Sequence, residues 1–180
     1  MIYESTPWKR ELRRSARMLS LWCGRAHTER GYFLLEKHVF LSAFVVRKLF
    51  DSHKVTDTLR LQPIEVRRFP AKMNVLGGIA SVFGKSFLSD AYELETGQVH
   101  SASMRDLVNQ IIHSFFFVID SAEDREISLF FNSDKTKGDF VVEVPMSRYV
   151  KLLKATADDH VRSYSLTVDR LTGKTKVALT

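Results

Sequence analysis

Residues 28–51, TERGYFLLEKHVFLSAFVVRKLFD, decide the fold of this chain. The stretch from Thr28 to about Asp51 has the apolar character of one long helix. Apolar residues point in almost every direction around the axis of such a helix, which is typical of a helix buried inside a fold. The stretch therefore predicts a long helix at the centre of the protein.

Two stripes of charge interrupt this apolar helix. One stripe consists of Arg30, Lys37 and Lys48 and is expected to face water, whereas the other consists of Glu29, Glu36 and Arg47 and is expected to be partly buried. We predict that Glu36 and Arg47 are less exposed than Lys37 and Lys48. Each should have a charged or hydrogen-bonding partner, because a buried unpaired charge costs several kcal/mol.

A first helix is predicted to begin at Thr6, with Pro7 in the first helical position, and to end near Arg25. It has an apolar side formed by Trp8, Leu12, Ala16, Leu19, Trp22 and Cys23. Its opposite side is cationic and is formed by Lys9, Arg10, Arg13, Arg14 and Arg17. This amphipathic pattern predicts a helix that packs on the fold through one side and offers the other to an anionic partner.

Strand-like and shorter helical patterns follow the two helices. We expect an edge strand over 58–69 with an irregularity at Pro63, and a loop over 72–100 with a short helix at 87–93. A helix over 103–113, capped by Ser103, should follow, and then strands over 115–120, 126–131 and 139–144. The chain should end with a helix over 147–157 and a hairpin of 164–168 with 175–179. The strands at 126–131 and 139–144 should form a hairpin.

Helices first and strands later indicate an α+β fold. We predict two N-terminal helices, the second long and central, packed on a mostly antiparallel sheet from the C-terminal half. A length of 180 residues suits one domain over 1–180, with a basic helical part at 1–57 and a mixed, strand-rich part at 58–180.

The net charge of +6 is unevenly distributed. Residues 1–60 contain 12 Lys and Arg against 6 Asp and Glu, whereas residues 61–180 contain 15 of each class. The excess of cations favours an anionic partner, either nucleic acid or an acidic protein, at the N-terminal part. The leading hypothesis is a non-catalytic binding module that uses the basic side of the first helix.

Several features bear on compartment and chemistry. The single Cys23 allows no intramolecular disulfide, the longest apolar runs are too short to cross a bilayer, and no signal-peptide pattern is present, so we expect a cytoplasmic protein that does not enter a membrane. The histidines lack the spacings of metal ligands, so neither a metal nor a cofactor is predicted.

Arg47 and His53 are separated by five residues at the end of the long helix. This spacing resembles the R-x(4–6)-H motif of HEPN ribonucleases, small helical domains that cleave RNA without a metal. The pair Asn109 and His113 has the spacing of the related R-N-x3-H motif, although Val108 stands where that motif has arginine. The resemblance covers at most about the first 115 residues.

The resemblance implies that a histidine removes the proton of a ribose 2′-OH while Arg47 stabilises the phosphorane. The candidate catalytic residues are Arg47, His53, His113, Asn109 and Glu36. The structural interpretation is an ion pair of Arg47 with Asp51 or Glu36, and histidines placed at helix C-termini.

The apolar helical segment 32–50 supports another alternative. It has more apolar surface than a chain of this length readily covers, so it would suit a regulatory or structural subunit that binds another protein, and a homo-oligomer is also left open. On balance the sequence favours a binding module over an enzyme.

Overall fold

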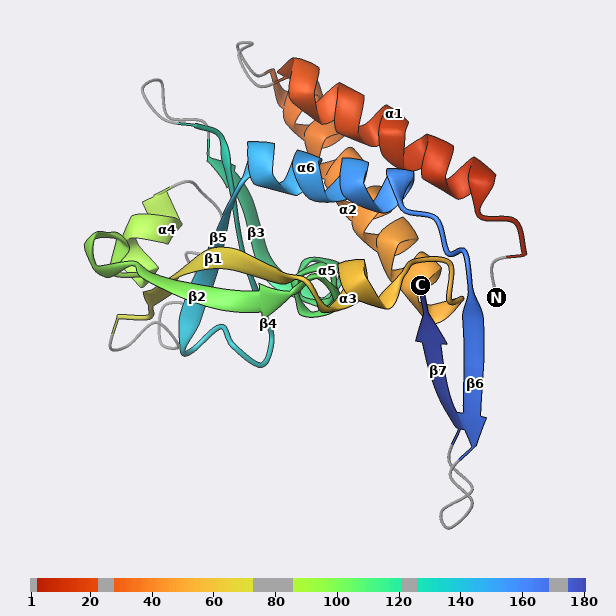
Figure 1. Ribbon diagram of the computed structural model, residues 1–180. Helices are drawn as coiled ribbons and strands as arrows, with labels where there is room; N and C mark the ends of the chain where they lie inside the picture. The colour runs from red at the N-terminus through yellow and green to blue at the C-terminus, as the bar shows by residue number, and fades with distance from the viewer. Residues whose placement is uncertain (1–2, 23–27, 73–85, 121–125, 169–174) are drawn as a thin grey trace.

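The predicted long helix is present in the computed structural model as helix α2, Glu29–Asp51 (Figure 1). The structure describes residues 3–22, 28–72, 86–120, 126–168 and 175–180. Thr28 caps α2, because its hydroxyl accepts a hydrogen bond from the backbone N–H of Gly31 at 3.2 Å. Helix α1, Thr6–Trp22, precedes it, and the last residues expected in that helix lie outside the described ranges.

The remaining elements complete an α+β fold. They are α3 (Asp57–Leu61), β1 (Pro63–Pro70), α4 (Ser86–Ala91), the 3-10 helix η2 (Leu94–Thr96), β2 (Gln98–Ser103), α5 (Met104–Ile112), β3 (Ser114–Asp120), β4 (Ser128–Ser133), β5 (Phe140–Pro145), α6 (Met146–Asp158), β6 (Tyr164–Val168) and β7 (Thr175–Leu179). The fold class is the predicted one. The predicted capped helix (α5), the hairpin of β4 with β5 and the helix after it (α6) are confirmed.

Five strands form an antiparallel sheet in the order β2-β1-β5-β4-β3. One face contributes Val66, Phe131 and Val144 to the main core, which it shares with α1, α2, α5 and α6. The other face contributes residues such as Phe130 to a smaller core that includes Leu88 of α4. Figure 1 accordingly shows α4 away from α1, α2 and α6. Neighbouring residues on a strand thus serve two different cores.

Helix α2 is held against α6 by a buried polar contact. The hydroxyls of Ser42 and Tyr149 are 2.9 Å apart, and that of Tyr149 lies 3.1 Å from the carbonyl oxygen of Val39. Burial raises the pKa of Tyr149, so the phenol stays protonated and can donate. The contact fixes α6 beside α2, and α1 lies along α6 on the outside of the helical layer (Figure 1).

The strand predicted over 58–69 is present only from Pro63, and the prediction that it lies at an edge of the sheet is wrong. Residues Asp57–Leu61 form helix α3, because the hydroxyl of Thr56 accepts a hydrogen bond from the backbone N–H of Leu59 and starts a helical turn. Strand β1 then begins at Pro63 and lies between β2 and β5, in the interior of the sheet. Proline is tolerated there because it is the first residue of the strand.

The structure corrects two further expectations and confirms a third. Residues 98–100, expected to be part of a loop, belong to the edge strand β2, which pairs with β1 although its side chains are largely polar. The final hairpin is confirmed, but it forms a two-stranded sheet of its own. Helix α2 is not buried all round, since Phe33, Leu41 and Phe44 are 59%, 52% and 45% exposed.

Candidate functional site

Helix α1 has most of the two-sided character expected from its sequence, although Trp8, predicted on the apolar side, is 38% exposed. Leu12, Ala16 and Leu19 are fully buried in the main core. On the outer side, Arg10, Arg14 and Arg17 are exposed, and Arg14 has only a long ion pair of 4.0 Å with Glu11. Arg10 and Arg17 make no ion pair with any residue that the structure describes. These cations are therefore available to an anion in solvent.

Lys9 does not belong to this exposed side, contrary to the prediction. Lys9 is only 3% exposed, and its ammonium group donates a hydrogen bond to the backbone carbonyl oxygen of Asp159. Burial lowers the pKa of Lys9, an effect opposed by the nearby carboxylate of Asp159. A helical wheel places Lys9 beside the arginines, but it does not reveal that the end of α6 covers this position.

Arg13 joins α1 to the last turn of α6. Its Nε donates to the carboxylate of Asp158 at 2.9 Å, and its Nη2 donates to the carbonyl oxygen of Ala157 at 2.9 Å. The carbonyl groups of a final helical turn lack helical partners and carry partial negative charge, so a guanidinium is a favourable partner there. Arg13 is thus partly occupied by a structural role.

The packing of α1 against α6 creates a shallow concavity of ≈ 410 Å³. Its lining consists of Arg13, Arg17, Ser20, Leu21, Lys154 and Asp158. The cations Arg17 and Lys154 face this concavity from different helices, and its one acid, Asp158, is engaged by Arg13. The concavity therefore carries excess positive charge.

Helix α6 extends the basic surface in a way that the sequence analysis did not identify. Lys151 and Lys154 are exposed and lie on the same stripe of α6 as Asp158. The helical spacing of these residues was a signal that could have revealed a second basic side, but only the packing places it beside α1. We call the combined set the α1–α6 basic surface: Arg10, Arg13, Arg14, Arg17, Lys151 and Lys154.

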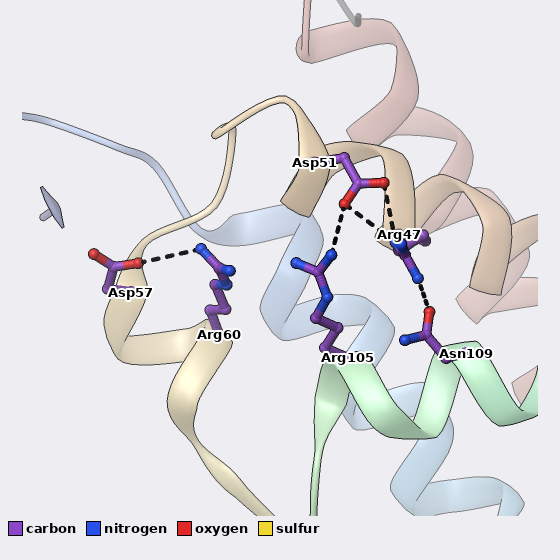
Figure 2. Close-up of polar contacts among 6 residues, drawn as sticks. All are labelled: Arg47, Asp51, Asp57, Arg60, Arg105 and Asn109. Carbon is purple, nitrogen blue, oxygen red and sulfur yellow. Dashed lines mark hydrogen bonds and ion pairs between the residues drawn. The ribbon is translucent and has the colours of Figure 1, made fainter. Parts of the chain in front are cut away.

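The candidate catalytic arginine takes part in a network between α2 and α5 (Figure 2). The Nε of Arg47 lies 3.0 Å from the carboxylate of Asp51, and its Nη1 donates to the side-chain oxygen of Asn109. Arg105 also binds Asp51, at 3.2 Å. The expected ion pair of Arg47 with Asp51, one helical turn further on, is confirmed. This pair gives Arg47 a structural role.

The predicted order of exposure on α2 is also confirmed. Glu36 and Arg47 are partly buried, whereas Lys37 and Lys48 are exposed. Arg47 has the partners expected of it, but Glu36 makes no hydrogen bond or ion pair with a residue in the described ranges. The partner predicted for Glu36 is therefore not found within the described ranges, and Glu36 does not contact Arg47 through a hydrogen bond or ion pair.

The candidate histidines occupy helix C-termini. His113 is the C-cap of α5, and its backbone N–H binds the carbonyl oxygens of Asn109 and Ile111. His53 follows the C-cap of α2 with a positive φ of 55°, and its N–H donates to Phe50 at 3.1 Å. In the described part of the chain, neither imidazole contacts Arg47 through a hydrogen bond.

His53 closes a Schellman motif. The N–H of Lys54 donates to the carbonyl oxygen of Leu49 at 2.9 Å, and together with the His53 bond this forms the paired contacts typical of that helix ending. The position requires a left-handed backbone, which costs about 1–2 kcal/mol for a residue other than glycine. Backbone geometry, rather than imidazole chemistry, dominates the environment of this residue.

Among the described residues, no group of three or more His, Cys, Asp and Glu side chains is arranged to hold a metal ion. Within the same ranges, no helix combines the length and the apolar character needed to cross a membrane. Comparisons with protein-family models, curated proteins and solved structures give no match.

We predict that His53→Gly raises the free energy of unfolding by about 0.5–1 kcal/mol, because glycine adopts the left-handed conformation without a steric cost. Thermal or denaturant unfolding measures the change. The matched control is His113→Gly, at a helix end where φ is −104°, which should give no such gain. A loss of stability in His53→Gly would contradict this account.

The same variant tests the ribonuclease alternative without the ambiguity of an unfolded protein. We expect the wild-type chain to leave RNA intact in EDTA. Metal-independent cleavage that is present in the wild type and absent in a stably folded His53→Gly variant would support catalysis by the imidazole instead.

Proposed function

We propose that this chain is a non-catalytic binding module that contacts nucleic acid through the α1–α6 basic surface. The observation that supports the proposal most strongly is the meeting of Arg17 and Lys154 at one concavity whose only acid is already paired with Arg13. The two helices contribute six cations to this surface, and the exposed cations among them remain available for phosphates.

The form of the surface favours an extended anion over a small one. Arg10, Arg14 and Arg17 recur at about one helical turn, a rise of roughly 5 Å, so they form a row of charge along the outside of α1. The concavity beside this row is open rather than enclosed, which suits a phosphate backbone. An acidic protein is the alternative partner, and the experiment below distinguishes it.

Contact through phosphates predicts binding that does not depend on base sequence. Trp22, the aromatic residue at the end of α1, packs against the main core and is not available to stack on bases. Arginine and lysine contacts to phosphate position a nucleic acid but carry no direct sequence information. We therefore expect weak, salt-sensitive binding of both RNA and DNA.

The decisive comparison uses two triple variants of equal net charge. We expect Arg10→Glu/Arg14→Glu/Arg17→Glu to weaken binding of a labelled oligonucleotide on the order of tenfold or more, as measured by fluorescence anisotropy at low salt. The control, Arg30→Glu/Lys37→Glu/Lys48→Glu, reverses three exposed cations on α2. Each variant lowers the net charge from +6 by 3 × 2, to zero. Arg13 is left intact because it joins α1 to α6.

Equal weakening by both triple variants would contradict a site on α1, since it would show that only net charge matters. A Lys151→Glu/Lys154→Glu variant tests whether α6 contributes, and it should also weaken binding. If a labelled acidic polypeptide binds while neither RNA nor DNA binds, the partner is an acidic protein and the nucleic-acid proposal fails.

A second candidate function concerns the outer face of α2. Phe33, Leu41 and Phe44 are 59%, 52% and 45% exposed, although large apolar side chains that form a contiguous strip are usually covered. The ammonium group of Lys48 lies 5.4 Å from the centre of the Phe44 ring, and Lys37 is exposed between the two phenylalanines along the helix. An apolar strip with cations beside it suits an amphipathic helix that has acidic flanks.

We infer that such a helix, from another protein, docks on this strip. A model peptide with leucines at heptad spacing and flanking glutamates is the probe. Phe33→Ser/Phe44→Ser should abolish its binding in isothermal titration calorimetry, while Leu61→Ser, which alters an exposed residue on α3, should not. No binding by the wild type, or equal loss in the control, would remove this candidate.

A further inference from the structure

Strand β6 is an exposed strand of the C-terminal hairpin. It pairs with β7 in a two-stranded sheet that is separate from the five-stranded sheet, and the hairpin extends beyond α3 (Figure 1). All five residues of β6 are exposed. An isolated two-stranded ribbon is marginally stable in water, so a further strand would stabilise it.

The hydrogen bonds of the hairpin identify its open edge. Ser163 and Thr180 exchange both backbone hydrogen bonds, so they form a hydrogen-bonded pair. Since such pairs alternate with non-hydrogen-bonded pairs in an antiparallel ladder, the N–H and C=O groups of Tyr164, Leu166 and Val168 point away from β7. Within the part of the chain that the structure describes, these three residues of β6 have backbone groups without a strand partner along one edge.

The other edge of the hairpin is already in contact with the fold. The backbone N–H of Leu179 donates to the carboxylate of Asp57 on α3 at 2.9 Å. Leu179 is opposite Tyr164, and the direction of its N–H agrees with the alternation inferred from the Ser163 pair. A new strand can therefore add to β6 without displacing α3.

Strand β6 lacks the features that protect an exposed edge. Its sequence, YSLTV, contains no charge and no proline, and its pairing with β7 is regular. Tyr164, Leu166 and Val168 also project to one side, where they are 55%, 55% and 57% exposed. The open edge and an uncovered apolar face occur on the same three residues.

We propose that β6 pairs with β6 of a second copy of this chain, in antiparallel orientation about a twofold axis at Leu166. This register places Leu166 opposite the Leu166 of the other copy and Tyr164 opposite the other Val168. Every outward backbone group of the three residues then has a partner, giving about six hydrogen bonds. The product is a four-stranded sheet in the order β7-β6-β6-β7.

A second copy fits this edge because the strand is self-complementary under reversal. Apolar residues oppose apolar residues on one face, and Ser165 opposes Thr167 on the other. No like charges are brought together within the strand. Twofold pairing of identical patches is the commonest form of protein self-association, and it closes without leaving an edge of β6 free. This inference does not depend on nucleic-acid binding.

The dimer is tested by sedimentation velocity of the full chain without nucleic acid. Its interface is smaller than a standard protein interface, so the mass should rise from monomer to dimer between micromolar and near-millimolar concentration. In the Leu166→Lys variant, the lysines of the two copies would face each other on the twofold axis. Their repulsion should keep this variant a monomer at every concentration. The matched control, Ser165→Lys, alters the other face and should still dimerise.

A cysteine experiment tests the register by a gain of signal. In a Cys23→Ser background, Leu166→Cys should form a disulfide-linked dimer on mild oxidation, because residues opposed in a hydrogen-bonded pair have Cα atoms about 5.5 Å apart. Ser165→Cys should not, since its two copies are diagonal neighbours about 7–8 Å apart. A monomeric wild type, dimers that persist in Leu166→Lys, or equal cross-linking of both cysteine variants would each overturn the proposal.

Discussion

The contacts of Asp159 hold together the parts of the fold on which both surfaces depend. Its backbone carbonyl accepts from the buried ammonium group of Lys9, while its carboxylate accepts from the N–H and the hydroxyl of Thr56, each at 2.7 Å. One residue thus connects the first turns of α1, the end of α6 and the start of α3. A buried lysine is tolerable there only because it has a polar partner at this point.

Two consequences follow from this anchor. With Lys9 bound at the end of α6, α1 lies along α6, and Arg17 and Lys154 meet at the concavity. With Thr56 held by Asp159, α3 begins where Asp57 can accept from Leu179 of the hairpin. The basic surface and the open edge of β6 are therefore positioned by the same small group of hydrogen bonds.

The elements that the sequence predicted well are those determined by local signals. Ser103 caps α5 as expected, and apolar spacing predicted both α2 and α5. Strand β2 was missed because its polar residues become a strand only by pairing with β1. In the same way, Lys9 is buried because the end of α6 packs against it. A helical wheel cannot predict this contact, because it describes only one helix.

In the candidate sites too, contacts within one helix were predictable from the sequence, whereas contacts between elements were not. The ion pair of Arg47 with Asp51 is local to one helix and was predictable, whereas its contact with Asn109 requires the packing of α2 on α5. The arginines of α1 were recognised from their spacing, but Lys154 joined them only through long-range packing. Anion-binding surfaces assembled from two helices are therefore harder to identify from sequence than the charge of either helix.

The most direct measurement of the central claim is a map of backbone and side-chain chemical shifts during titration with a short oligonucleotide. Our account predicts that the shifts concentrate on two segments far apart in sequence, around Arg10–Arg17 on α1 and around Lys151–Lys154 on α6, and that they diminish as salt rises. Shifts confined to α1, or centred on the outer face of α2, would contradict a binding surface formed jointly by α1 and α6.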